Sequence, residues 1–169
     1  MKKITKWIIL LLILQAVAMF LMQGPFPFSM KAIKEVSGGY GVLDTRFSYS
    51  PETAYEYFDH YGVEGRTKYD PFQLIDLFYP LAYSLFLSCL LFLSFPKKKI
   101  IWLIPLVAAL FDYIENGLLY LTNHHFPDIN PTLIHYSSFC TSAKWTLILI
   151  SILLILMGIF LRIRLKKNK

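Results

Sequence analysis

Residues 71–120, PFQLIDLFYPLAYSLFLSCLLFLSFPKKKIIWLIPLVAALFDYIENGLLY, decide the fold. The stretch contains two apolar blocks, 72–95 and 100–121, and a short run of lysines separates them. Each block is long enough to cross the hydrocarbon core of a bilayer, which needs about 20 residues of helix. Backbone groups find no water inside a bilayer, so such blocks must be helical. The short turn between them makes the two spans antiparallel neighbours.

Two further apolar blocks, 4–22 and 140–161, flank this pair along the chain. Hydrophobic residues make up 56% of the sequence, above the ~45–50% of an ordinary soluble domain. The sequence therefore predicts an all-α integral membrane protein with four transmembrane helices in one bundle. We expect a single membrane domain over residues 1–169, with partly ordered extracytoplasmic segments at 23–71 and 122–139.

The first block has some features of a secretory signal peptide. A basic start precedes the apolar run, and Ala16 and Ala18 stand at the spacing of a cleavage site after residue 18. The apolar run nevertheless continues through Met22. We expect a retained anchor, with cleavage of residues 1–18 as the alternative.

The formal net charge is +6 at pH 7, and its location matters more than its size. Basic residues gather at both termini and in the 96–99 turn, whereas segment 23–71 carries more acids than bases. By the positive-inside rule, both termini and this turn face the cytoplasm of a cell membrane, and segments 23–71 and 122–139 face outward. The basic termini then lie against anionic lipid head groups. This explanation leaves no reason to expect a nucleic-acid partner.

The outer segments show weaker patterns. Ser50 is suited to cap a short helix over 51–62, and Gly62 is suited to end it. Residues 43–49 alternate and predict a short strand or an extended strap. Segment 122–139 contains two prolines and predicts an irregular cap. An aromatic stripe on the short helix is expected to cover the bundle, and it consists of Ala54, Tyr57, Phe58 and Tyr61.

Four ionisable residues stand inside the predicted spans: Asp76, Asp112, Glu115 and Lys144. Each costs roughly 2.5–3.5 kcal/mol on insertion scales, so such residues usually face the bundle interior and have partners. Asp112, Glu115 and Asn116 are spaced i, i+3 and i+4, on one side of a helix. The sequence thus predicts an outward-opening polar pocket lined by Asp76, Tyr83, Asp112, Glu115, Asn116 and Lys144.

The charges of the predicted pocket do not balance, because it contains three acids and only one lysine. One carboxyl could stay protonated through burial and like charge. Alternatively, Arg46 or Arg66 from the outer segment could cap the acids. A bound cation is the third solution. The sequence leaves these three alternatives open.

Several site classes are disfavoured. Cys89 and Cys140 fall at opposite depths of the membrane, too far apart for a disulfide, and a thiol-relay enzyme would need cysteine pairs near the outer face. The histidines of segment 122–139 match no standard zinc spacing, so we expect no metal site. Which cofactor the protein binds, if any, is unknown from the sequence, and no GxSxG motif or serine triad is evident.

Three motifs, LDTRFSYSPE (43–52), GVEGRTKY (62–69) and FDYIEN (111–116), together resemble a family of small four-span bacterial membrane proteins without a described activity. The resemblance covers the chain from Leu43 to Lys144. It implies a topology and a shared site, but no reaction. Its marked positions are Asp44, Arg46, Gly65, Arg66, Asp112, Glu115 and Asn116. It also implies that Arg46 and Arg66 are the outer partners of the acids.

Three functions stay open. The leading hypothesis is a structural bundle that binds a membrane protein partner, with the polar cluster keeping the helices in register. The second is binding or transport of a lipid head group, a small amphiphile or a cation. The third is a membrane-embedded enzyme that acts on a lipid or isoprenoid, with Asp112 or Glu115 as acid/base and Lys144 as charge stabiliser.

Overall fold

The computed structural model describes the backbone of residues 2–167 and the side chains of residues 6–165. The described chain contains helices and connecting turns but no β-strand. The helices are α1 (Lys2–Gln23), α2 (Met30–Val36), the 3-10 helix η1 (Leu43–Thr45), α3 (Pro51–Asp76), α4 (Phe78–Ser94), α5 (Lys99–Trp102), α6 (Ile104–His125) and α7 (Pro131–Lys167).

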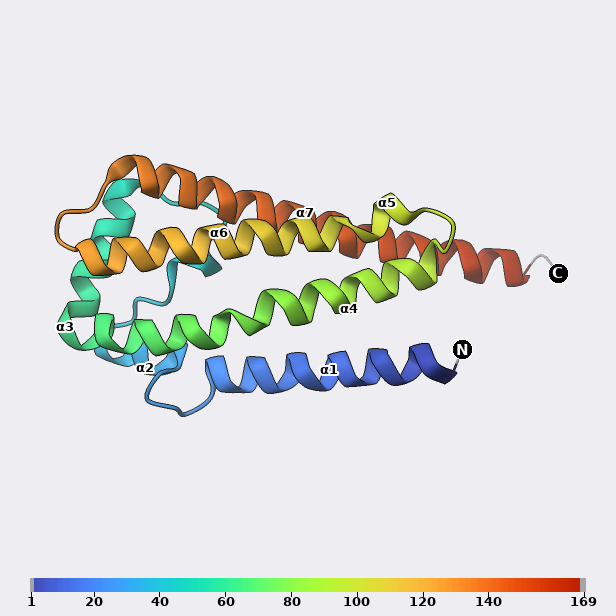
Figure 1. Ribbon diagram of the computed structural model, residues 1–169, viewed down its shortest axis with the longest axis horizontal. Helices are drawn as coiled ribbons and strands as arrows, with labels where there is room; N and C mark the ends of the chain where they lie inside the picture. Colours follow the sequence, from blue (N-terminus) through green and yellow to red (C-terminus); the bar gives the residue numbers. More distant parts are fainter. Residues whose placement is uncertain (1, 168–169) are drawn as a thin grey trace.

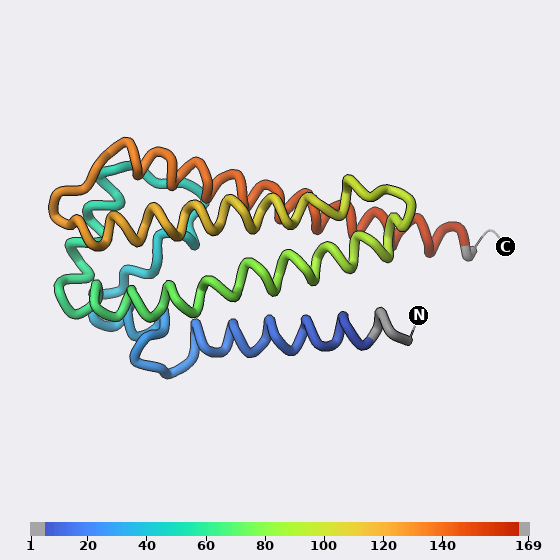
Figure 2. Tube along the Cα trace, viewed as in Figure 1, coloured from blue at the N-terminus to red at the C-terminus, as the bar shows by residue number. Residues whose placement is uncertain are grey.

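Four helical runs form a long bundle (Figure 1). The runs are α1, α3 with α4, α5 with α6, and α7, and each contains a window long and apolar enough to cross a membrane. The expectation of an all-helical chain with four such helices is confirmed. Both chain termini lie at one end of the bundle, and α2, η1 and α3 gather at the other end (Figures 1 and 2). We call these the terminal end and the cap end.

The bundle packs through a limited set of helix pairs. Helix α6 packs along α7 and α4, and α1 packs along α4. Ala108 and Ala109 of α6 are buried against α4 and α7, and such small residues let helices approach closely. At the terminal end, Trp102 Nε1 donates to Phe95 O over 2.9 Å, and Ser88 Oγ donates to Trp102 O over 2.7 Å. These bonds secure the predicted tight turn.

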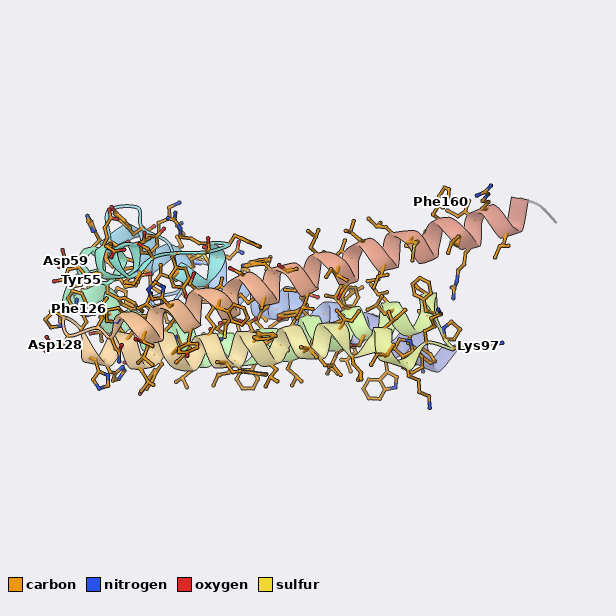
Figure 3. The ribbon with its side chains drawn as sticks, turned by 90° about the horizontal axis from the view of Figure 1, so that it is seen from above. Tyr55, Asp59, Lys97, Phe126, Asp128 and Phe160 are labelled. Carbon is orange, nitrogen blue, oxygen red and sulfur yellow. The ribbon has the colours of Figure 1, made fainter. Side chains whose placement is uncertain are left out.

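The outer surface of the bundle is strongly apolar. Only 11% of the most apolar window of α7 is buried, and Leu153, Leu156 and Phe160 are each at least 56% exposed. Figure 3 shows side chains projecting outward along α7 as far as Phe160. A continuous apolar surface of this extent is typical of helices that face lipid.

The cap end has its own aromatic core. Ser50 Oγ accepts a hydrogen bond from the Thr53 amide over 3.2 Å, and Pro51 opens α3, so the predicted start of this helix is confirmed. Phe58 and Tyr61 of the predicted stripe are buried in one cluster with Leu119 of α6. The core also contains Ile33, Val42, Leu43, Tyr69, Phe72 and Ile134. The cap is therefore packed on the bundle.

Gly62 breaks α3 without ending it. Its backbone has φ 58° and ψ −169°, which is not helical, yet the helix resumes and runs to Asp76. The predicted stop at Gly62 is therefore a kink. The polar residues that follow the glycine continue the helix because Tyr69 and Phe72 are buried in the cap core.

One expectation for the outer segments is met in part, and one was wrong. Residues 43–49 form a 3-10 turn followed by extended chain, so the predicted strap is present in part and the alternative, a strand, is not formed. Segment 122–139 is mostly helical, because α6 continues to His125 and α7 begins at Pro131. The second proline begins a helix, with Asn130 Oδ1 accepting from the Thr132 amide over 2.9 Å. Proline is well suited to a first helical position, so it did not mark an irregular region.

Candidate functional site

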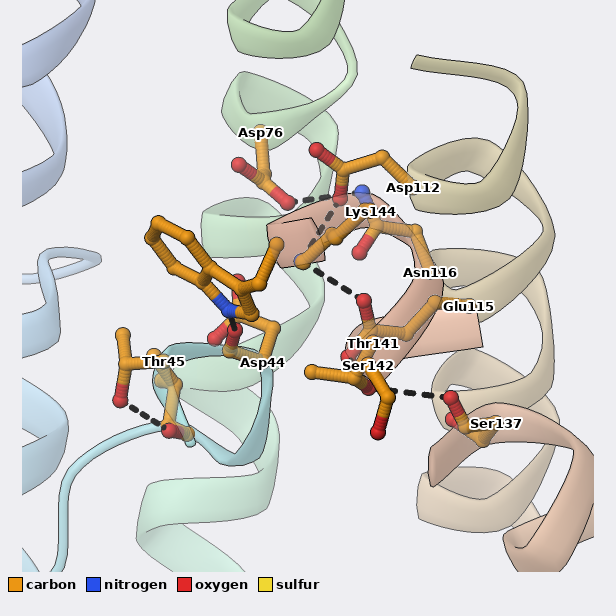
Figure 4. Close-up of polar contacts among 12 residues, drawn as sticks. Asp44, Thr45, Asp76, Asp112, Glu115, Asn116, Ser137, Thr141, Ser142 and Lys144 are labelled. Carbon is orange, nitrogen blue, oxygen red and sulfur yellow. Dashed lines mark hydrogen bonds and ion pairs between the residues drawn. The ribbon is translucent and has the colours of Figure 1, made fainter. Parts of the chain in front are cut away.

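Lys144 on α7 is the centre of the polar cluster (Figure 4). Its Nζ lies 2.9 Å from Asp112 Oδ1 and 2.6 Å from Glu115 Oε2, both on α6. The three side chains are at most 5% exposed. The two acids reach one ammonium because a spacing of three residues places them on the same side of the helix. The ion pairs join α6 to α7 in the bundle interior.

The other predicted pocket residues of the spans converge on the same place. Asn116 Nδ2 donates to Asp76 Oδ2 over 2.7 Å, and the Tyr83 hydroxyl donates to Asp112 Oδ2 over 3.1 Å. Gln73 Nε2 donates to the carbonyl of Asn116 over 3.1 Å. Helices α3, α4, α6 and α7 thus each contribute a polar side chain to one buried cluster.

Sequence reasoning missed a chain of hydroxyl groups behind Glu115. The Thr141 hydroxyl donates to Glu115 Oε1, and the Tyr49 hydroxyl lies 2.7 Å from Ser137 Oγ. The Tyr49 amide donates to Ser138 Oγ over 2.9 Å. Burial, followed by the charge of Glu115, raises the pKa of Tyr49, which keeps its hydroxyl neutral. Spacing could have indicated Ser137 and Thr141, which lie one helical turn apart on the same face as Lys144.

Asp44 is a further acid that the pocket prediction omitted. It lies in η1, is 9% exposed, and its Oδ1 has no hydrogen-bond partner among the described residues. Trp145 Nε1 donates to the Asp44 carbonyl over 3.1 Å and fixes the turn on α7. Burial raises the pKa of Asp44, Lys144 opposes this shift, and Asp112 adds to it. Only the marked positions of the family resemblance had included Asp44.

Arg46 and Arg66 do not partner the acids, so that expectation was wrong. Arg46 donates to the Tyr57 hydroxyl over 3.0 Å, and Arg66 donates to the Phe58 carbonyl over 3.0 Å. The guanidinium of Arg66 also lies 4.6 Å from the ring centre of Phe126. Both arginines face the surface of the cap. The η1 turn directs Asp44 into the bundle and leaves Arg46 exposed, so the outer segment adds another acid to the site.

A cavity of about 350 Å³ lies beside the cluster, between α1, α4 and α7, and we call it the α1–α7 cavity. Its polar wall consists of Asp44, Thr45, Asp76, Tyr79, Tyr83, Asp112, Lys144 and Trp145. Its apolar wall consists of Phe86, Leu87, Ile148 and Ile152. Helix α1 and the chain after it contribute Gln15, Met19, Met22, Gln23 and Met30. Met19 and Ile152 are each 42% exposed, so the cavity reaches the apolar surface of the bundle.

The predicted pocket residues divide into two groups at this cavity. Asp76, Tyr83, Asp112 and Lys144 line it, whereas Glu115 and Asn116 do not. Glu115 is fully buried behind Lys144. The cavity wall therefore carries three carboxyl groups, including that of Asp44, beside one ammonium.

Other reactive residues lie apart from the cavity. No group of three or more His, Cys, Asp or Glu side chains among the described residues has a geometry that could hold a metal ion. The cysteines, Cys89 and Cys140, are both free thiols. The imidazole of His124 lies 3.6 Å from the Asp70 carboxylate on the exposed surface of the cap end.

Comparison with protein-family models, curated proteins and solved structures finds no match. The resemblance to four-span bacterial membrane proteins therefore stays a prediction.

Proposed function

We propose that this protein is an integral membrane protein that binds an amphiphilic small molecule in the α1–α7 cavity. The terminal end faces the cytoplasm, because the basic residues of the termini and of the 96–99 turn gather there. The cap end faces outward. The ligand enters from the bilayer with its polar group beside the acids and its apolar part between α1 and α7.

The observation that carries this proposal is the position of the acids on the wall of a cavity. A cluster kept for helix packing alone needs only the ion pairs of Lys144 with Asp112 and Glu115. It needs neither a cavity nor a buried carboxyl oxygen without a partner, as at Asp44. Such a group costs free energy unless something binds it. Ligand sites usually combine an apolar wall with a few polar groups and often have volumes of ~300–1,000 Å³.

The two alternatives have less support. Coupled transport usually relies on inverted repeats or broken spanning helices. The runs α3–α4 and α5–α6 are each interrupted at a single residue, but the sequence has no internal repeat. Acid/base catalysis by Glu115 would require contact with a substrate, yet Glu115 is fully buried and lies off the cavity wall. Asp112 lies on the wall but is already bound by Lys144 and Tyr83.

The test fills the apolar part of the cavity and leaves the polar cluster untouched. Ile152→Trp places an indole on the cavity wall, whereas Leu153→Trp places one on the neighbouring surface, outside the cavity. Both positions are more than 40% exposed, so both variants should fold. Native mass spectrometry of protein purified in a mild detergent should show a co-purifying small molecule on the wild type and on Leu153→Trp, but not on Ile152→Trp.

Two results contradict the proposal. One is bare wild-type protein that also binds no added single-chain amphiphile. The other is equal retention of the ligand by both tryptophan variants, which would place the ligand elsewhere on the surface.

A further inference from the structure

The charges around the α1–α7 cavity are strongly unequal. Four carboxyl groups, those of Asp44, Asp76, Asp112 and Glu115, lie in or beside its polar end. The ammonium of Lys144 is the one basic group among the residues that line the cavity. With all five groups ionised, the site is short of positive charge, and buried charges without partners are costly.

Lys144 does not favour an anionic ligand, because its ammonium group is already paired with two carboxyl groups. It contacts Asp112 and Glu115 at 2.9 and 2.6 Å. With both carboxyl groups ionised, these three groups carry a net negative charge. An incoming phosphate or carboxylate would therefore meet excess negative charge beside a lysine that is already paired.

Asp44 and Asp76 are the two acids of the cluster that Lys144 does not contact directly. Neither forms an ion pair with any described residue, and Asp76 accepts a hydrogen bond from the neutral amide of Asn116. Asp44 is nine-tenths buried, and its Oδ1 has no hydrogen-bond partner among the described residues. Both acids line the cavity. A cationic group of the ligand would supply what both carboxyl groups lack.

Aromatic side chains beside the acids favour the same kind of ligand. Tyr79, Tyr83 and Trp145 line the polar end of the cavity. The faces of such rings attract ammonium groups, most strongly where water is excluded. The apolar wall begins directly beyond them, with Phe86 and Ile148. The cavity wall thus changes from acidic to aromatic to apolar along its length. This order matches a molecule with a charged amine at one end of a hydrocarbon chain.

We propose that the amphiphile bound in the α1–α7 cavity is a cationic, single-chain amine, whose ammonium group lies between Asp44 and Asp76. This inference rests on the proposed function, because it requires the cavity to be a ligand site. It selects against uncharged and anionic amphiphiles of the same chain length.

The experiment compares three probes that share one chain: dodecylamine, dodecanol and dodecyl phosphate. Each is titrated against the full-length protein in a nonionic detergent at neutral pH, and native mass spectrometry measures the bound fraction. We expect the amine to bind at least about tenfold more tightly than the alcohol, and the phosphate to bind most weakly. Asp44→Asn should weaken amine binding by about tenfold and leave alcohol binding unchanged. The matched control Asp59→Asn removes the same charge from an exposed site and should change neither.

Each outcome separates this inference from the proposed function. Equal binding of amine and alcohol, with both lost in Ile152→Trp, keeps the ligand site and overturns the cationic head group. If dodecyl phosphate binds most tightly of the three probes, the cationic head group is overturned as well. Binding that Ile152→Trp does not weaken contradicts the proposed function itself. The ratio of amine to alcohol affinity is measured on the wild type, so it decides the question even if Asp44→Asn fails to fold.

Discussion

At the scale of single residues, the site is distinguished by Asp44, a buried acid with one carboxyl oxygen that has no hydrogen-bond partner among the described residues. Lys144 contacts Asp112 and Glu115, and its charge is offset by theirs. Asp44 receives no such contact, although it is buried on the wall of the same site. Residues that lower stability in the free protein are often those that a ligand requires.

The titration of Asp44 provides a test. Asp112 on α6, Lys144 on α7 and Asp76 on α3 all face it, and burial is the largest cause of its raised pKa. A carboxyl group whose pKa is higher in the folded state favours folding only when protonated. The free energy of unfolding therefore falls as the pH rises above the ordinary aspartate pKa of about 3.9. Asp44→Asn should raise the midpoint of thermal unfolding at neutral pH. This increase in the midpoint should disappear at about pH 4.

Thermal unfolding of the ligand-free protein in detergent, followed by circular dichroism across this pH range, measures the effect. Asp59→Asn is the matched control, because Asp59 is exposed on the cap, and its curve should follow the wild type. A loss of stability in Asp44→Asn at neutral pH would mean that the folded protein depends on the charge of Asp44.

At the scale of elements, the kink in α3 places the cap over the bundle. The residues before Gly62 and those after it pack on a single aromatic core, with Phe58 on one side of the kink and Phe72 on the other. A straight helix would carry its first turns away from α6 and α7. The backbone angles at Gly62 belong to a region that is essentially restricted to glycine.

A pair of glycine substitutions tests this role. Gly62→Ala should destabilise the protein by roughly 1–3 kcal/mol, because alanine cannot adopt these backbone angles without strain. Gly117→Ala should be neutral or stabilise it by up to about 1 kcal/mol, since Gly117 is an exposed helical glycine of α6. An added Cβ meets no atom within 4 Å at either position, so the comparison isolates the backbone. Chemical denaturation in detergent micelles gives both values, and equal effects would contradict a special role for Gly62.

At the scale of the whole molecule, the sequence predicted the helical bundle and the convergence of its buried ionisable residues for one reason. Charged residues are rare in apolar blocks, so Asp76, Asp112, Glu115 and Lys144 were conspicuous. Asp44 was not, because an acid in a polar segment gives no sign of being buried. The prediction that Arg46 and Arg66 pair with the acids was wrong for a related reason. The charge of a residue shows what it can pair with, but it does not show in which direction a turn of the backbone points the side chain.

The orientation of the bundle is testable in cells. In a background with Cys89→Ala and Cys140→Ala, single cysteines are introduced as Asp128→Cys and Lys98→Cys, both at exposed positions. A membrane-impermeant maleimide should label Asp128→Cys in intact cells. It should label Lys98→Cys only after the membrane is disrupted, because that turn lies at the basic, terminal end. The reverse pattern would invert the topology and place the acids near the cytoplasmic face.

The two ends of the α1–α7 cavity differ in how freely their side chains can move. Asp76 and Tyr83 are held by hydrogen bonds to neighbouring helices, so the charged end has a fixed form. Met19, Met22 and Met30 line the opposite side, and methionine is unbranched and adapts to irregular shapes. Under the proposed function, we therefore expect binding to be selective for the polar group and tolerant of the hydrocarbon, so that the protein binds a series of molecules that differ in chain length and share one head group.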